Sequence, residues 1–204
     1  MIGRTQFHDE CAVGLSKQAK TLSSRQLTHL LSFLSLTRHP VRNRAIVLLS
    51  VKAGLRAKEI AFLTWEMLTE ADGELSAVIR LRNDATKGDS GRIIPLNREL
   101  LEVLGHLQGT RGQSPFVITT ERAQRTSAAA IVNLFGYWYR RLGFHGCSSH
   151  TGRRTFITNA ARKISLVGGS LRDVQMLAGH VALSTTQRYI EADVEAQRKV
   201  VDLV

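Results

Sequence analysis

Six residues in four short segments carry side chains that can bind an anion, move a proton or attack an electrophile. Three of the segments are basic and lie beside a predicted turn or helix start. The fourth places a tyrosine nine residues after a histidine, with small hydroxyl residues between them. The candidates are Arg56, Lys87, His150, Arg153, His180 and Tyr189. Planar guanidinium groups bind anions such as phosphate in a fixed geometry, and histidine exchanges protons near neutral pH.

Each candidate, taken alone, also has a structural explanation. Arg56 could form an ion pair with Glu59, three residues later on the same helix face. Lys87 could be a solvated loop lysine, and His150 could satisfy a nearby backbone group. His180 could be a helix-end histidine that the helix dipole favours. Tyr189 could be a half-buried aromatic residue with a bonded hydroxyl. Residue type alone therefore leaves both explanations open.

The charge of the chain favours a polyanion as its partner. Lys and Arg number 28 and Asp and Glu 17, which gives a net charge of +11 and an isoelectric point near 10.5. An excess of this size most often marks nucleic acid binding, although a merely basic soluble protein is the alternative. Aromatic residues make up only 6% of the chain, which disfavours stacking on single strands. Duplex DNA bound through its phosphates fits better.

Length and composition exclude several classes of protein. At ~150 residues per domain, the 204 residues make one domain. The two cysteines, Cys11 and Cys147, are too few for a disulfide framework or a four-cysteine zinc site, and they suit a reducing compartment. The amino-terminal residues lack the apolar stretch of a signal peptide, and no run of ~18 apolar residues predicts a membrane span. We therefore expect a cytoplasmic protein.

Helical signals dominate the sequence that precedes the first strand. Ser23 and Gln26 have the spacing of a capping box, and leucines follow at helical intervals. Pro40 suits the first turn of a second helix, and Gly54 is suited to end it. A third, short helix is expected over 58–64.

The pattern then changes to two short strands. Residues 77–81 and 92–96 are largely apolar and flank a polar, glycine-containing segment at 83–91, which predicts a β-hairpin with a long, mobile tip. Helical patterns return after the hairpin. They are expected over 98–107, 127–142, 151–164, 171–177 and 194–203. The prediction is an α+β fold that is mostly helical with one small antiparallel sheet.

The order of the candidate residues resembles that of the tyrosine recombinase (phage integrase) family. The resemblance covers roughly residues 23–195, and the stretch from Leu177 to Tyr189 is its most specific part. The matching segments are Gly54-Leu55-Arg56 with Glu59-Ile60, Thr86-Lys87-Gly88 before Ile94-Pro95-Leu96, His150-Thr151-Gly152-Arg153, and Leu177-Ala178-Gly179-His180 with Ser184-Thr185-Thr186-Gln187-Arg188-Tyr189. The resemblance implies the family's catalytic domain over 23–204, including a carboxy-terminal helix, after an amino-terminal arm at 1–22.

The resemblance also implies a chemical role for each candidate. Tyr189 would attack a DNA phosphodiester and form a 3′-phosphotyrosine, so that religation needs no ATP. Arg56 and Arg153 would clamp the non-bridging oxygens, on which charge builds in the transition state.

The remaining three candidates would handle protons and hold the phosphate. Lys87, on the hairpin tip, would protonate the departing 5′-oxygen as general acid. His150 would accept the tyrosine proton as general base, and His180 would donate a hydrogen bond to the scissile phosphate. No Asp, Glu and His grouping has the spacing of metal ligands, so we expect no metal and no cofactor.

Three features depart from the family pattern. Arg154 stands where many members have a second histidine, which adds positive charge. Gly152 replaces a commonly apolar residue, and we expect it to loosen the start of its helix. The family usually carries a separate core-binding domain ahead of the catalytic domain, and residues 1–22 are too few to form one. We therefore expect a short, catalytic-domain-only member or a truncated remnant.

The expected function is site-specific DNA recombination in the bacterial nucleoid, by integration, excision or inversion. Recombination needs four active sites at a synapse, so we expect a tetramer, with an accessory directionality factor as a further partner. The apolar residues of the carboxy-terminal helix would dock on a neighbouring protomer or, alternatively, cover their own core; these are Val194, Val200, Val201 and Leu203. A type IB topoisomerase-like enzyme and a non-cleaving DNA-binding regulator are the rival functions.

Overall fold

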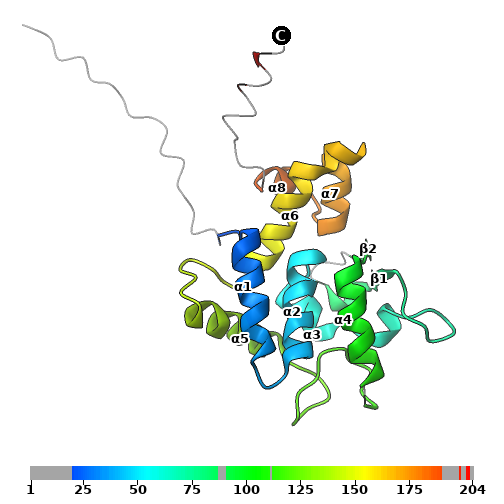
Figure 1. The fold of residues 1–204 in the computed structure, drawn as a ribbon. Coiled ribbons are helices and arrows are strands. Elements are labelled where there is room, and N and C mark those ends of the chain that lie inside the picture. The colour runs from blue at the N-terminus through cyan, green and yellow to red at the C-terminus, as the bar shows by residue number, and fades with distance from the viewer. Residues whose placement is uncertain (1–19, 87–90, 111, 190–197, 199–200, 203–204) are drawn as a thin grey trace, which may run out of the picture.

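The computed structural model describes residues 20–86, 91–110, 112–189, 198 and 201–202, and within them it is mostly helical with a two-stranded sheet (Figure 1). The α+β prediction is confirmed. The α-helices are α1 (Ser24–Ser35), α2 (Pro40–Lys52), α3 (Ala57–Phe62), α4 (Arg98–Gly109), α5 (Ala128–Arg141), α6 (Thr151–Lys163), α7 (Leu171–Ala178) and α8 (Leu183–Gln187). The strands are β1 (Val78–Leu81) and β2 (Arg92–Pro95), and the 3₁₀ turns are η1 (Trp65–Met67), η2 (Asn83–Ala85) and η3 (Ile164–Val167).

Helix α1 begins where the sequence predicts. The Ser23 hydroxyl accepts a hydrogen bond from the backbone N–H of Gln26 (3.2 Å), and the Gln26 side chain accepts one from the backbone N–H of Ser23 (3.0 Å). This reciprocal pair satisfies two backbone donors that the first turn leaves unpaired. Just before it, the backbone N–H of Leu22 donates to the Thr155 hydroxyl of α6 (2.8 Å). The rest of the predicted arm, residues 1–19, lies outside the described residues.

Helix α2 is the central helix of the larger part of the fold. All residues from Ala45 to Val51 are buried, and α2 packs against α1, α3, α4 and α6 (Figure 1). A helical stretch that is buried on all sides needs such neighbours to cover it. Pro40 is its first residue, and Gly54 just beyond its end adopts the left-handed conformation (φ 66°), as the sequence predicts.

The two strands form an antiparallel hairpin in which Ile79 pairs with Ile94 and Leu81 pairs with Arg92. Ile79 and Ile94 are buried, whereas Ile93 is 63% exposed. Side chains alternate between the two faces of a strand, so Arg92 shares the inward face of β2 with Ile94. The sheet therefore points an arginine toward the interior.

Both ends of the hairpin tip are fixed by side chains. The Lys58 ammonium of α3 donates to the carbonyl of Thr86 (3.0 Å), and the backbone N–H of Gly91 donates to the Asn83 side chain (2.8 Å). Residues 87–90, which include the predicted general acid, lie outside the described residues.

Buried apolar side chains form two separate clusters. The larger gathers residues from α1 through α5 and both strands, with Phe135, Trp138 and Tyr139 among its largest members. The smaller consists of Ile157, Val174 and Ala178, with partly buried neighbours from α6, η3 and α7 and the ring of Tyr189 packed against them; these neighbours are Phe156, Ala160, Ala161, Ile164 and Leu171.

Two glycines let α6 approach the α2–α3 junction. A β-carbon on Gly152 would clash with the side chain of Ser50 in α2, and one on Gly54 would clash with the ring of Phe156. The sequence suggests that Gly152 loosens the start of α6. Instead Gly152 is buried, α6 begins at Thr151, and the glycine allows two helices to pack closely.

The sequence analysis missed α8, whose five residues carry too little periodicity to reveal a helix. Its last predicted helix, 194–203, falls mostly on residues outside the described part of the chain. Among the described residues, no helix is long and apolar enough to cross a membrane.

Candidate active site

Arg56 is the residue just before α3, and it is tied to Glu59 in the first turn of that helix. The backbone N–H of Arg56 donates to Glu59 Oε2 (2.8 Å), and its Nη1 donates to Glu59 Oε1 (2.7 Å). The Glu59 side chain is 1% exposed, whereas that of Arg56 is 28% exposed. The ion pair considered from the sequence is therefore present, and it leaves part of the guanidinium accessible to a ligand.

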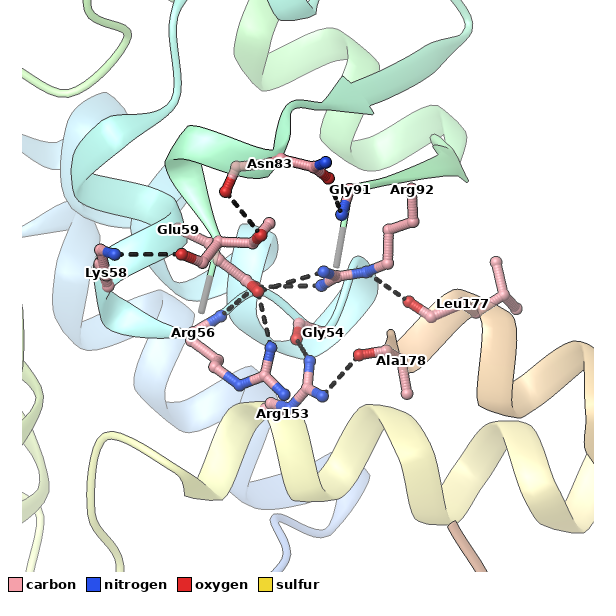
Figure 2. A network of polar contacts seen from close by, with 11 residues as sticks. Gly54, Arg56, Lys58, Glu59, Asn83, Gly91, Arg92, Arg153, Leu177 and Ala178 are labelled. Atoms are coloured by element: carbon pink, nitrogen blue, oxygen red, sulfur yellow. Dashed lines mark hydrogen bonds and ion pairs between the residues drawn. The ribbon is translucent and has the colours of Figure 1, made fainter. Parts of the chain in front are cut away.

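A second arginine holds the same carboxylate from the hairpin. Arg92 donates from Nη1 to Glu59 Oε1 (3.1 Å) and from Nη2 to Oε2 (3.0 Å), and its Nε donates to the carbonyl of Leu177 at the end of α7 (2.9 Å) (Figure 2). Its side chain is 5% exposed. Arg92 thus joins β2, α3 and α7 from a buried position.

Arg153, in the first turn of α6, is the most enclosed of those predicted catalytic residues that the structure describes. It is 4% exposed, and its guanidinium donates to the carbonyls of Gly54 and Ala178, both at 2.6 Å (Figure 2). These bonds hold the guanidinium between the loop that precedes α3 and the end of α7. Both acceptors are neutral backbone carbonyls, so they do not neutralise the positive charge of Arg153.

His180 follows α7 after a tight turn. Gly179 takes the left-handed conformation (φ 62°) that ends the helix, and the backbone N–H of His180 donates to the carbonyl of Gln175 (3.1 Å). The His180 Nδ1 lies 2.9 Å from the hydroxyl of buried Thr186 in α8. This bond fixes the ring orientation and ties α8 to the turn.

Tyr189 lies two residues beyond α8, against the ring of His180. The two ring centroids are 5.4 Å apart with an interplanar angle of 24°. The guanidinium of Arg154 lies 5.6 Å from the centre of the tyrosine ring, within range of a cation–π interaction. The Thr158 hydroxyl donates to the Tyr189 carbonyl (3.3 Å). The tyrosine is thus held by α6 and by the His180 turn.

The electrostatics of these residues are those of a cationic centre. Burial, with a further contribution from Arg56, lowers the pKa of Arg153 to about 10, so its guanidinium stays charged at neutral pH. Burial, reinforced by Arg153 and Arg56, lowers the pKa of His180 to about 4, so its imidazole is neutral. Burial opposes ionisation of Glu59, but hydrogen bonds and charges from Arg92 and Arg56 keep its pKa below the ordinary value.

The six predicted residues are brought together unequally. Contacts and mutual charge effects join Arg56, Arg153, His180 and Tyr189. His150 occupies the position before the first turn of α6 and is exposed. Lys87 lies outside the described residues.

Two residues of this network had no role in the site in the sequence analysis, although Glu59 lies in a segment that carries the family resemblance. Glu59 appeared there as an ion-pair partner of Arg56, and Arg92 appeared only as the start of a strand. The alternation of β2 was a usable signal, because buried Ile94 places Arg92 on the same inward face. A buried arginine requires a partner, and Glu59 is the buried carboxylate that it meets.

The arrangement can bind an anion and present a phenol to it. Two guanidinium groups pair with one carboxylate and the charge of a third, that of Arg153, interacts with it, which leaves an excess of positive charge near the tyrosine. Neutral His180 offers a hydrogen-bonding ring nitrogen rather than a further charge. Among the described residues, no group of three or more His, Cys, Asp or Glu could hold a metal ion.

In sequence the chain is similar to tyrosine recombinases. Residues 20–196 match the phage integrase family. Tyrosine recombinase XerC of Pelobacter propionicus is 31% identical over 168 residues, which cover 79% of this chain and 51% of the relative. Tyrosine recombinase XerA of Thermococcus kodakarensis is 30% identical over 184 residues, which cover 88% and 61%. The chain spans about half to three fifths of the length of these relatives.

The fold is similar to that of solved recombinase structures. The crystal structure of XerA recombinase superposes with a TM-score of 0.71 at 22% identity, covering 93% of this chain and 65% of that chain. The Tn1549 transposon integrase in complex with circular intermediate DNA superposes with a TM-score of 0.72 at 20% identity, covering 94% and 69%. At these identities the similarity establishes the arrangement of helices and strands.

Proposed function

The chain belongs to the phage integrase family, and from that premise we propose that it is a site-specific DNA recombinase that cuts and rejoins duplex DNA through a tyrosine. The observation that carries the proposal is the cationic centre near Tyr189, in which the charges of Arg56 and Arg153 act on His180 and the ring of Tyr189 stacks on that histidine. A scissile phosphate is the anion that such a centre suits, because its non-bridging oxygens gain charge as the phosphorane forms.

The cleavage step balances in atoms and charge. The Tyr189 oxygen forms a bond to phosphorus as the bond between phosphorus and the 5′-oxygen breaks, which leaves a 3′-phosphotyrosine and a free 5′-hydroxyl. The tyrosine proton goes to a general base, for which we propose His150. The 5′-oxygen takes a proton from a general acid, for which we propose Lys87. Rejoining is the reverse attack by a 5′-hydroxyl of another strand.

The supporting groups have complementary tasks. Arg153 is held rigidly by two carbonyls, so it can bind a phosphate oxygen without reorganising. Arg56 is more exposed, and the guanidinium donors that Glu59 does not take can bind a second phosphate oxygen. His180, neutral and fixed by Thr186, can donate a hydrogen bond to the phosphate.

The partners follow from the reaction. Duplex DNA is the proposed substrate, which is supported by the similarity of the fold to a transposon integrase in complex with circular intermediate DNA. Exchange of strands between two duplexes requires four tyrosines, so we propose a tetramer at the synapse, with residues 194–203 as its docking segment. An accessory directionality factor, acting with it on DNA in the bacterial nucleoid, completes the proposal.

Trapping the covalent intermediate tests the proposal. A pool of nicked duplexes of randomised sequence lets the small 5′-terminal fragment diffuse away after cleavage, so the adduct accumulates and resists SDS. The wild-type chain should form this adduct, and Tyr189→Phe should abolish it while it retains DNA affinity in a filter-binding assay. Tyr137→Phe is the matched control, because Tyr137 is 49% exposed on α5, away from the site. An adduct of equal yield from Tyr189→Phe, or none from the wild type, contradicts the proposal.

A further inference from the structure

Arg92 is a buried cation that the proposed chemistry does not use. Its side chain is 5% exposed, so it is shielded from DNA on the surface. It is nevertheless connected to the proposed phosphate site, because Arg92 and Arg56 both donate hydrogen bonds to the carboxylate of Glu59 (Figure 2). Arg92 can therefore affect how the guanidinium of Arg56 is oriented.

The carboxylate of Glu59 is divided evenly between the two arginines. Each of its oxygens accepts one hydrogen bond from Arg56 and one from Arg92. A carboxylate has room for about four donors, so these bonds fill its capacity. Arg56 therefore reaches Glu59 through a single guanidinium nitrogen, and its other donors are not needed by that carboxylate.

Removing Arg92 would change how Arg56 binds Glu59. The buried carboxylate would lose half of these donors, and an unsatisfied buried charge is strongly unfavourable. The guanidinium of Arg56 is already in contact through Nη1. It would satisfy the carboxylate best by turning into a bidentate pair, which is the preferred geometry between the two groups. In that position a second guanidinium nitrogen of Arg56 would donate to Glu59 and would not be available to a phosphate.

The orientation of Arg92 is itself fixed. Its Nε donates to the carbonyl of Leu177, which leaves the two terminal nitrogens directed at Glu59. A β-carbon on Gly179 would lie 2.9 Å from Arg92 Nη1, so the glycine makes room for this side chain. The neighbouring carbonyl, that of Ala178, is taken by Arg153. These contacts thus fix the orientation of the Arg92 guanidinium in the absence of DNA.

We propose that Arg92 is a positioning residue that occupies half of Glu59 and so keeps the guanidinium of Arg56 free to bind the scissile phosphate. The inference rests on the proposed function, since it concerns the same site. It assigns Arg92 no contact with DNA, and its effect passes through Glu59 and Arg56.

A double-mutant cycle tests this route. Arg92→Lys keeps the buried charge but replaces the planar fork by a single ammonium, which cannot bond both carboxylate oxygens and the Leu177 carbonyl in one plane. We expect single-turnover cleavage of a nicked duplex to slow roughly 10- to 100-fold, as for a misplaced catalytic group. The dissociation constant for DNA should stay within about twofold, because Arg92 is buried away from the duplex. In an Arg56→Ala background, Arg92→Lys should slow cleavage by less than about threefold, because residues that act as one unit are not additive.

Matched variants separate this role from a loss of folding. Arg80→Lys makes the same change on the neighbouring strand, in an exposed pair with Glu70, and should leave cleavage unchanged. Should Arg92→Lys fail to melt cooperatively, Arg92→Gln takes its place in the cycle.

Two results would overturn the inference. One is wild-type cleavage by a folded Arg92 variant, and the other is an equal slowing in the presence and absence of the Arg56 guanidinium. In both cases the wild-type chain still forms the adduct, so the proposed function stands. Absence of any wild-type adduct is instead the failure of the proposed function.

Discussion

The two clusters of buried side chains differ in size and in which of the proposed catalytic residues they support. Arg56 and Glu59 stand on α3, whose buried residues belong to the large cluster built around α2. Tyr189 packs on the small cluster, which has three fully buried members. Arg56 therefore rests on the larger cluster, whereas the proposed nucleophile, together with Arg153 in α6 and His180 after α7, rests on the smaller and more sparsely packed one. Sparse packing gives a low free energy of local opening.

Arg153 is the side chain that ties the two parts together. One of its hydrogen bonds goes to Gly54 beside the large cluster and the other to Ala178 in the small one. The same guanidinium is thus proposed to bind the substrate, and it also links α6 and α7, on which Tyr189 packs, to the rest of the fold. This double duty distinguishes it from Arg56, which bonds within α3.

The largest expected effect separates the two arginines. Arg56→Ala and Arg153→Ala should each slow single-turnover cleavage roughly 100- to 1,000-fold, because each removes a strong donor from the transition state. Arg153→Ala should also reduce the free energy of unfolding more than Arg56→Ala does, since it leaves two buried carbonyls unsatisfied at about 1–3 kcal/mol each. Cleavage rates and urea denaturation curves measure the two effects. Equal stabilities of the two variants would remove Arg153 from its bridging role.

A smaller effect concerns how each part opens. Leu48→Ala, in the centre of α2, should lower the free energy of global unfolding by about 2–5 kcal/mol. Val174→Ala, in α7, loses two methyl groups and should cost about 1.6 kcal/mol of transfer free energy, expressed mainly as faster opening of α7 and α8.

Native-state hydrogen exchange distinguishes these two outcomes. Amides of α7 should exchange with a lower free energy than those of α2 in the wild type, and Val174→Ala should widen that gap. A single exchange free energy for both helices would show that the molecule opens as one unit and would contradict the predicted difference between the two clusters.

The smallest expected effect is a pH dependence carried by His180. Its pKa is about 4 in the folded chain because of burial and then the charges of Arg153, Arg56 and Arg92, whereas an unfolded histidine titrates near 6.5. Between these values the unfolded state binds more protons, so acidification from pH 6.5 to 4 lowers stability. His180→Gln lacks this contribution.

Urea denaturation at pH 7 and pH 4.5 checks the prediction. The loss of stability between the two pH values should be smaller in His180→Gln than in the wild type. An identical loss in both proteins, or a folded-state His180 that titrates near 6.5 by NMR, would contradict the assigned burial and charge effects.

The sequence predicted those parts of the fold that local chemistry determines. The capping box at Ser23, the proline at the start of α2 and the glycine at its end depend on neighbours a few residues away, and all are present. Helix α8 escaped detection because five residues complete little more than one turn. Gly152 was misjudged because its effect depends on Ser50, about a hundred residues earlier in the chain.

The sequence indicated which residues gather at the site but not the hydrogen bonds and ion pairs that link them. The family resemblance identified Arg56, Arg153, His180 and Tyr189, which the structure brings into one neighbourhood. It could not indicate that Arg92 would cross from the hairpin to Glu59, because that contact depends on how β2 packs on α3. Nor could composition reveal which arginines would be buried, since an isolated arginine favours water.

The hydrogen bonds that assemble this site span long stretches of chain. Arg153 reaches Gly54 across 99 residues, and Arg92 reaches Leu177 across 85. Closing loops of this length costs entropy before any contact repays it, and contacts of high sequence separation form late in folding. A nascent or partly folded chain therefore carries every reactive side chain without an assembled centre. The capacity to cleave DNA that we propose would therefore arise only when the whole domain has folded.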